Sequence, residues 1–205
     1  MSSLTTENIN ILIAIPTFDS ILPDTFKSIY GLYIPEGVSC FFDFVRGYDC
    51  AKARNDIAKE ALKYNFDYVL MIDSDIIVPS NALQNMLETH VDICLGVYPR
   101  KNTKDETVEL FKLGYDNFIE TYHMSELEKF NSIFEVKGGG YGCALICTKV
   151  FKNITFPWFR YVTYSNGFVL SEDNYFSDKI SSEGYKIYCD PRVKCGHAAV
   201  HIQWR

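Results

Sequence analysis

An apolar run that ends in two carboxylates, between Phe66 and Pro79, constrains the fold more than any other stretch of the chain. Residues 68–72 (Tyr-Val-Leu-Met-Ile) have the length of a strand and contain no charged side chain. A continuous apolar strand is typical of a parallel sheet that is covered by helices on both faces. Open α/β sheets bind their ligands at the carboxyl ends of such strands. The stretch therefore predicts a buried strand with a ligand site at its end.

Two aspartates, Asp73 and Asp75, follow this strand directly and are separated by Ser74. Two carboxylates at the edge of a buried sheet cost free energy unless a cation or a substrate compensates them. Mg²⁺ prefers oxygen ligands and commonly combines one or two carboxylates with phosphate oxygens. The pair predicts a metal–diphosphate site. The alternative is an ordinary acidic turn, in which Asp73 caps its own loop or the helix that begins near Ser80.

Composition and charge limit the possible classes of protein. A chain of 205 residues with 47% apolar and 22% charged residues is typical of one soluble globular domain, residues 1–205. A net charge of −6 argues against nucleic-acid binding. The sequence has no apolar run of the ~18 residues that a membrane span requires, and no signal-peptide pattern. The seven cysteines contain no Cys-x-x-Cys pair, which indicates a reducing compartment and predicts a cytoplasmic location.

Strand-length apolar runs alternate with amphipathic helical patterns through the first half of the chain. The apolar runs are residues 9–15, 38–45, 68–72 and 91–97. The helical patterns fall within residues 19–33, 50–64 and 80–90, and Ser80 is the expected N-cap of the last helix. This alternation predicts an α/β fold with a mostly parallel sheet over residues 9–97 and right-handed crossovers.

The second half has shorter and more varied patterns, which predict a smaller mixed sheet. Its strand-like runs are residues 107–112, 117–121, 133–136 and 185–189. A glycine-rich segment, residues 138–142, and an aromatic stretch, residues 157–170, separate these runs, and the aromatic stretch is expected to be a loop. Ser171 is a suitable N-cap for a helix from Glu172 to about Ser182, and Gly184 is its expected stop.

Four segments in this order resemble the GT-A fold glycosyltransferases, especially the family-2-like group. They are Ile13-Ala-Ile-Pro-Thr17, Ala53-Arg-Asn55, Asp73-Ser-Asp75 as an Asp-x-Asp motif, and Ser171-Glu-Asp173. The ending from Gly184 to His197 is also similar to that group, and a fainter likeness is to sugar-transferring domains encoded by large DNA viruses. The resemblance implies a Rossmann-like GT-A domain. Residues 1–98 would bind the nucleotide sugar, and residues 99–205 would hold the acceptor and the catalytic groups. The chain could also be one domain of a longer protein.

The resemblance implies a metal-dependent transfer of a hexosyl or deoxyhexosyl group from a nucleoside-diphosphate sugar to a glycan or another hydroxyl acceptor. UDP-sugars are favoured over GDP-sugars as donors, with Mn²⁺ or Mg²⁺ as cofactor. Transfer with inversion and transfer with retention of the anomeric configuration both stay open.

Three residues form the predicted metal site. Asp75 is the first expected ligand, and the resemblance implies that Asp73 reaches the ribose or metal-bound water. The Gly-His position of the family falls on His197, and an imidazole ligand suits Mn²⁺ better than Mg²⁺. The alternative is that His197 is a core residue.

The predicted donor site begins with Pro16 and Thr17, which end the first strand where the base and ribose would lie in this fold; Ser74 belongs to the same set. Arg54 stands in the first turns of its helix, and a cation there is unfavourable unless an anion is near, which favours a phosphate partner. A salt bridge from Arg54 to Asp49 or Asp56 is the alternative. Arg46 is a weaker candidate of the same kind.

The glycine-rich segment, residues 138–142, is the other expected donor contact. It lacks the pattern of a P-loop or of a dinucleotide fingerprint. Gly140 would let the backbone approach the donor, and Tyr141 would stack on it. A simple turn is the alternative.

Glu172 and Asp173 are the predicted catalytic residues. Acidic side chains in the first turn of a helix are stabilised by its dipole, so a purely structural role is an open alternative. In inverting members of the resembled family, the Asp of Glu-Asp accepts the proton of the acceptor hydroxyl, and that position is Asp173 here. In retaining members an acidic side chain at this position could only hold sugar hydroxyls.

Other functions fit the pattern less well. A Mg²⁺-dependent phosphohydrolase of the haloacid-dehalogenase type would place its Asp-x-Asp after the first strand rather than the third. A nucleotidyltransferase would need a glycine-rich, arginine-containing loop where this chain has Ile15-Pro16-Thr17-Phe18. A non-catalytic sugar-binding module would explain the many aromatic residues but not the combination of Asp73, Asp75 and His197.

Overall fold

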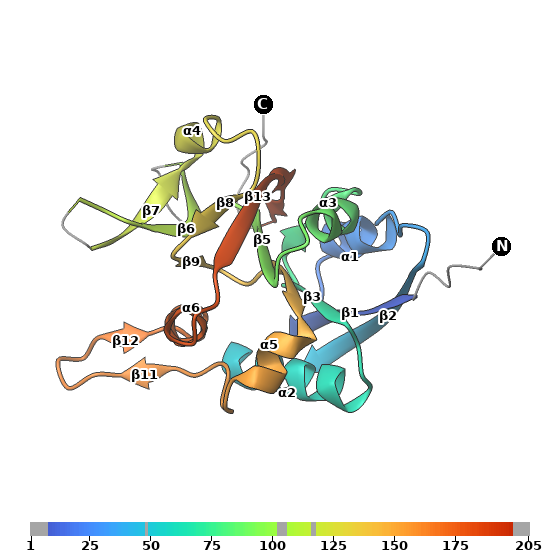
Figure 1. The fold of residues 1–205 in the computed structure, drawn as a ribbon, viewed down its shortest axis with the longest axis horizontal. Helices are drawn as coiled ribbons and strands as arrows, with labels where there is room; N and C mark the ends of the chain where they lie inside the picture. The colour runs from blue at the N-terminus through green and yellow to red at the C-terminus, as the bar shows by residue number, and fades with distance from the viewer. Residues whose placement is uncertain (1–7, 48, 102–105, 116–117, 199–205) are drawn as a thin grey trace.

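The computed structural model describes residues 8–47, 49–101, 106–115 and 118–198, and its centre is a seven-stranded sheet (Figure 1). The strand order is β2-β1-β3-β10-β5-β13-β8. These strands are β1 (Ile9–Thr17), β2 (Val38–Arg46), β3 (Tyr68–Ile72), β5 (Ile93–Val97), β8 (Phe134–Val136), β10 (Cys143–Cys147) and β13 (Ile187–Lys194). The helices are α1 (Pro23–Tyr30), α2 (Cys50–Lys63), α3 (Ala82–Glu88), α4 (Met124–Leu127), α5 (Thr148–Asn153) and α6 (Glu172–Ser182).

The predicted apolar strand, residues 68–72, is β3, and it lies inside the sheet between β1 and β10. Its side chains alternate between two hydrophobic clusters. Val69 and Met71 pack on one face of the sheet, whereas Leu70 and Ile72 pack on the other. Each of these four side chains is fully buried, and full burial of one such side chain stabilises the fold by about 1.5–3 kcal/mol. The absence of polar residues in this run therefore follows from its two covered faces.

Helices cover both faces of the sheet, as the sequence predicts. Figure 1 shows α1 and α3 on one side of β1 and β3, and α2 and α5 on the other. The cluster on the first side contains Ile29 and Leu83, and the cluster on the second contains Ile57 and Phe151. No helix among the described residues is both long enough and apolar enough to cross a bilayer.

Within residues 9–97 the strand pairs of the central sheet are parallel, but the sheet as a whole is mixed, so the prediction of a mostly parallel central sheet is not confirmed. β1 pairs in parallel with β2 and with β3, and β5 pairs in parallel with β13. However, β10 lies antiparallel between β3 and β5, and β8 is antiparallel to β13. β10 follows the glycine-rich segment at the carboxyl edge of the sheet and runs back from there. Burial on both faces makes a strand apolar whichever direction its neighbours run, so the sequence pattern did not reveal this insertion.

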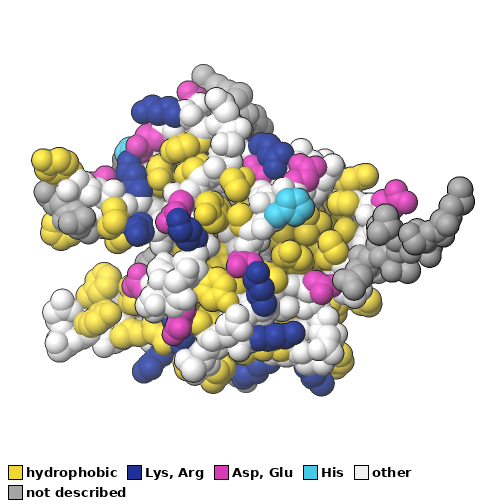
Figure 2. All heavy atoms as spheres, in the orientation of Figure 1, with side chains coloured by type: hydrophobic (Ala, Val, Ile, Leu, Met, Phe, Trp, Pro, Cys, Tyr) yellow, Lys and Arg dark blue, Asp and Glu magenta, His cyan; other side chains and the backbone are white. Residues whose placement is uncertain are grey.

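Among the described residues, three small antiparallel sheets accompany the central one, where the sequence predicted one smaller mixed sheet in the second half. They contain β11 (Val162–Thr163) with β12 (Val169–Leu170); β14 (Gly196–His197) with β4 (Ile76–Ile77); and β6 (Thr107–Leu113) with β7 (Ile119–His123) and β9 (Gly138–Gly139). The β11–β12 hairpin falls in the stretch 157–170 that was predicted to be a loop. Figure 2 shows hydrophobic side chains on this hairpin, where Tyr164 and Phe168 are about half exposed.

Two helix starts illustrate how far capping signals predict boundaries. The prediction for α6 is confirmed, because the Ser171 side chain accepts a hydrogen bond from the Asn174 backbone N–H, and Gly184 adopts a φ of 84° just after the helix. The predicted N-cap Ser80 is wrong: α3 begins at Ala82 after Asn81. The Asn81 side chain makes no capping hydrogen bond, so no local signal marked this start.

Candidate active site

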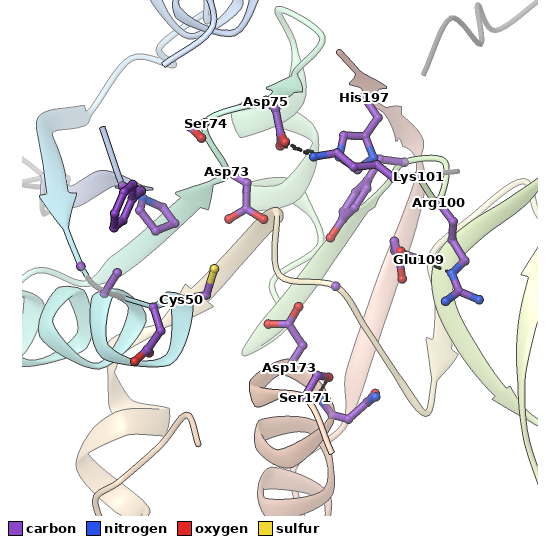
Figure 3. Close-up of a pocket in the computed structure, with 18 of the residues that line it drawn as sticks. Cys50, Asp73, Ser74, Asp75, Arg100, Lys101, Glu109, Ser171, Asp173 and His197 are labelled. Atoms are coloured by element: carbon purple, nitrogen blue, oxygen red, sulfur yellow. Dashed lines mark hydrogen bonds and ion pairs between the residues drawn. The ribbon is translucent and has the colours of Figure 1, made fainter. Parts of the chain in front are cut away.

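An open cavity of about 830 Å³ lies at the carboxyl edge of the sheet and gathers most of the predicted site residues (Figure 3). The predicted residues that line it are Pro16, Thr17, Asp73, Ser74, Asp75, Gly140, Asp173 and His197. Four other predicted residues, Arg46, Arg54, Tyr141 and Glu172, do not line it. Each set has a structural explanation.

Short strands bring His197 to Asp75. β14 pairs antiparallel with β4, so that His197 lies opposite Ile76, and the Ala198 backbone N–H donates to the carbonyl of Asp75. His197 Nε2 lies 3.6 Å from Asp75 Oδ1. The other ring nitrogen, Nδ1, lies 2.7 Å from the carbonyl oxygen of Pro99. A carbonyl can only accept a hydrogen bond, so Nδ1 carries a hydrogen and Nε2 is directed toward the carboxylate.

This geometry fits a divalent cation. A neutral His197 presents the lone pair of Nε2 toward a negative carboxylate, which is favourable only if a cation lies between them or the ring takes a second proton. A carbonyl that fixes the ring in this way is the usual support for a metal-binding histidine. Among the described residues no group of three His, Cys, Asp or Glu side chains could hold a metal, so Asp75 and His197 offer two ligands. Two protein ligands are sufficient for a cation that also binds phosphate oxygens.

Lys101 is a site residue that the sequence analysis missed. Its ammonium group forms an ion pair with Asp75 Oδ2. With the His197 ring doubly protonated, its Nε2–H and the ammonium group of Lys101 lower the pKa of Asp75 to about 2, against the opposing effect of burial. Lys101 follows β5 closely at the carboxyl edge of the sheet, and this position is the signal that could have identified it.

Arg54 is buried in a cluster of carboxylates and does not face the cavity. Its side chain is 1% exposed; Nη1 lies 3.1 Å from Asp73 Oδ1, and Nε lies 3.3 Å from Asp173 Oδ1 and 3.7 Å from Glu172 Oε1. The predicted phosphate contact is therefore corrected, because three carboxylates already surround this guanidinium. The alternative partners Asp49 and Asp56 are also wrong. The sequence did not reveal these partners because they come from β3 and α6, far from Arg54 in the chain.

Asp173 lies at the start of α6 and faces Asp73 across the cavity (Figure 3). Its Oδ2 accepts a hydrogen bond from the Tyr141 backbone N–H at 3.3 Å. Burial raises the pKa of Asp173 to about 7, and the negative charges of Glu172 and Asp73 add to this effect while Arg54 opposes it. A carboxyl group with this pKa can take up and release a proton near neutral pH. Glu172, the other predicted catalytic residue, is buried beside Arg54 and does not line the cavity.

Tyr141 supports the site through its backbone, so the prediction that its ring stacks on the donor is wrong. The ring is fully buried against Phe159 and Phe176, and its hydroxyl pairs with Ser177. Its carbonyl accepts a hydrogen bond from Arg54 Nη1 at 3.3 Å. The buried ring therefore holds the glycine-rich segment against the carboxylate cluster.

Arg46 lies away from the main cavity. It pairs with Asp19 at 2.6 Å, and its side chain is 72% exposed. It lines a smaller neighbouring pocket together with Asp19 and Lys52. The structure thus places Arg46 at the surface, beside rather than among the clustered site residues.

Solved structures with the same architecture identify the fold. The crystal structure of A197 from STIV superposes on this structure with a TM-score of 0.61 at 18% sequence identity, over 92% of this chain and 85% of that chain. GalNAc-T7 with UDP, GalNAc and Mn²⁺ gives a TM-score of 0.61 at 12% identity, over 92% of this chain and 44% of that chain. The chain has a GT-A glycosyltransferase fold.

Comparisons by sequence add no relatives to this result. No protein-family model matches the chain, and a search of curated proteins finds no match. The GT-A fold is therefore established here by its three-dimensional arrangement, and the chain spans less than half of GalNAc-T7.

Proposed function

We propose that the protein is a metal-dependent glycosyltransferase that moves a hexosyl or deoxyhexosyl group from a nucleoside-diphosphate sugar to a hydroxyl group of a glycan or another acceptor. The observation that carries the proposal is the meeting of Asp75 with His197 in the cavity that also contains Asp173. The UDP and Mn²⁺ bound in the similar structure of GalNAc-T7 support a UDP-sugar donor ahead of a GDP-sugar.

Asp75 and His197 would hold Mn²⁺. They would also hold Mg²⁺, although Mg²⁺ binds an imidazole nitrogen less favourably than Mn²⁺ does. Such a cation would neutralise charge on the leaving diphosphate. Asp73 would contact the ribose or water bound to the cation. Lys101 would leave Asp75 and add a second positive charge beside the diphosphate.

Asp173 would act on the acceptor. As the bond between the anomeric carbon and the diphosphate breaks and the acceptor oxygen bonds to that carbon, the acceptor hydroxyl loses its proton, which Asp173 would accept. Arg54 and the Tyr141 N–H would hold the Asp173 carboxylate in place, and Glu172 would hold Arg54. This role applies to an inverting reaction. In a retaining reaction Asp173 would only orient sugar hydroxyls.

The cavity would divide between the two substrates. Pro16, Thr17 and Ser74 would contact the nucleotide, in keeping with a donor-binding half of residues 1–98. The exposed Phe168 and Val169 at the cavity rim would contact the acceptor, in keeping with an acceptor half of residues 99–205. An aromatic side chain can stack on the apolar face of a sugar ring.

The proposed location of the protein rests on its cysteines. All seven cysteines are free, and we take this as support for a cytoplasmic location. The proposed domain could function alone or within a longer protein.

The test is incubation with a panel of UDP-, GDP-, dTDP- and CDP-sugars and Mn²⁺, with candidate glycan acceptors. Transfer or slow hydrolysis of one donor supports the proposal. Release of inorganic phosphate from phosphate esters would instead indicate a phosphohydrolase. Sugar binding without any turnover would indicate a binding module.

A further inference from the structure

Tyr98 places a hydroxyl group at the cavity that the mechanism above does not use. It follows β5 directly, and the residue as a whole is 4% exposed. Its ring packs edge-on against the His197 ring, with the centroids 5.6 Å apart. The residue nevertheless lines the cavity beside Asp73 and Gly140. Its buried ring gives the hydroxyl a fixed position.

Two glycines make room for this hydroxyl. A Cβ atom at Gly140 would lie 1.9 Å from the Tyr98 hydroxyl oxygen, so no side chain fits there unless the Tyr98 hydroxyl moves. A Cβ atom at Gly142 would lie 3.0 Å from the same oxygen and 2.9 Å from Asp73 Oδ2. Because neither glycine has a positive φ, close packing explains a glycine at both positions: Tyr98 approaches Gly140, and Asp73 and Tyr98 together approach Gly142.

The hydroxyl oxygen is already engaged as an acceptor. The Gly142 backbone N–H donates to it at 3.0 Å. In the parts of the chain that the structure describes, no acceptor is found for the hydroxyl hydrogen itself. A hydroxyl that is held in a fixed position and has an unused donor can donate a hydrogen bond to a ligand oxygen in the cavity.

The charges around Tyr98 favour a neutral ligand group. Asp73, Asp173 and Glu109 line the cavity together with Tyr98. Asp73 and Asp173 are paired with Arg54, and Glu109 is paired with Arg100, so the cations in this part of the cavity already have anionic partners. The carboxylate oxygens can still accept hydrogen bonds from sugar hydroxyls. Lys101 contacts Asp75 and therefore stands near the position proposed for the diphosphate.

We propose that Tyr98 determines specificity for the donor sugar, with its hydroxyl hydrogen donated to a hydroxyl oxygen of the transferred sugar. Glu109 lines the same part of the cavity and accepts a hydrogen bond from the sugar. Gly140 and Gly142 are positioning residues that keep the Tyr98 oxygen in place. This inference rests on the proposed function and adds to it the residue that recognises the sugar.

Calorimetry in Mn²⁺ tests the proposal with UDP and with the UDP-sugar that binds the wild type most tightly. Tyr98→Phe removes only the hydroxyl. We expect it to bind UDP as the wild type does and to bind the UDP-sugar about three- to tenfold more weakly. Tyr122→Phe is the matched control, because Tyr122 is a buried tyrosine in the core beside Phe130 and Phe134, outside the cavity. It should change neither affinity.

Donors that lack single sugar hydroxyls identify the contact. One deoxy donor should bind the wild type with the loss seen for Tyr98→Phe, and should show no further loss with that variant. If Tyr98→Phe does not fold, Gly140→Ala displaces the hydroxyl while keeping the tyrosine, and the same selective loss is expected. Equal loss for UDP and UDP-sugar, or no loss for either, overturns the Tyr98 proposal alone. A wild-type protein that binds no nucleotide sugar overturns the proposed function together with it.

Discussion

Arg54 Nε lies 3.3 Å from Asp173 Oδ1, and Nη1 of the same guanidinium lies 3.1 Å from Asp73 Oδ1. One buried cation from α2 thus joins a carboxylate at the end of β3 to a carboxylate at the start of α6. The two acids come from opposite walls of the cavity. Their separation is therefore held by the core and does not depend on a ligand.

Removal of the Arg54 charge should destabilise the protein strongly. Arg54→Met keeps much of the side-chain volume but leaves three carboxylates without their cation, and the expected loss is about 3–5 kcal/mol of unfolding free energy. Urea unfolding measures this loss. Arg46→Met is the matched control, since Arg46 pairs with Asp19 at the surface, and its loss should stay below about 1 kcal/mol. Similar small losses for both variants would show that the buried cluster contributes little.

Asp173→Asn should separate a catalytic role from a structural one. The amide keeps the size and hydrogen bonding of the side chain but cannot accept a proton. For an inverting reaction we expect kcat to fall by about 10²–10⁴-fold with nucleotide affinity unchanged. A purely structural role of Asp173 at the helix start would instead leave most of the activity in place. If Asp173→Asn keeps most of the activity, Asp173 is not the catalytic base. A product in which NMR shows retained anomeric configuration would also contradict that role.

The pH dependence of activity should follow Asp173. Its pKa is raised to about 7, and only the ionised form can accept a proton, so kcat/KM should rise with pH up to about 7 and then level off. This rising limb should be absent from the residual activity of Asp173→Asn. A wild-type profile that is flat between pH 5 and 8 would contradict the assignment.

Stability should depend on pH in the opposite direction. Because the pKa of Asp173 is higher in the folded protein than its ordinary value of 3.8, the folded state binds more protons between about pH 4 and 7. The contribution of this group to stability is therefore greatest below pH 4 and is lost as pH rises through 7. Asp75 behaves in the reverse way, since its lowered pKa of about 2 gives stability that is lost between about pH 4 and 2. Thermal unfolding of wild type and Asp173→Asn across this range isolates the first effect.

Replacement of Asp75 or His197 should weaken cation binding. Asp75→Asn removes the charge that both His197 and Lys101 contact, and His197→Ala removes the directed Nε2. Titration of Mn²⁺ with UDP, followed by electron paramagnetic resonance, should show at least about tenfold weaker binding for each variant. Asp49→Asn, which removes a cavity carboxylate that caps α2, is the control for general loss of negative charge. If the Asp75 and His197 variants bind Mn²⁺ as tightly as Asp49→Asn does, the two predicted ligands are wrong.

The sequence by itself determined the elements whose signals are local. β3 was predicted with its observed bounds because a strand covered on both faces admits no charged residue. α6 was predicted from Ser171 and Gly184 because capping is a contact between near neighbours in the chain. The Asp73–Asp75 pair was predicted to belong to a site because two carboxylates at a buried edge are costly without a partner, and both residues line the cavity.

The tertiary structure alone decided which groups meet. Arg54 stands near Asp49 and Asp56 in the chain, yet its partners are three carboxylates from other elements. Tyr141 and Tyr98 are both tyrosines near apolar runs, but one ring is sealed in the core while the other brings its hydroxyl to the cavity. Sequence patterns record the polarity of the surroundings of a side chain, and they do not record which distant side chains form those surroundings. Long-range packing makes that choice, and it is why β10, His197 and Tyr98 lie where they do.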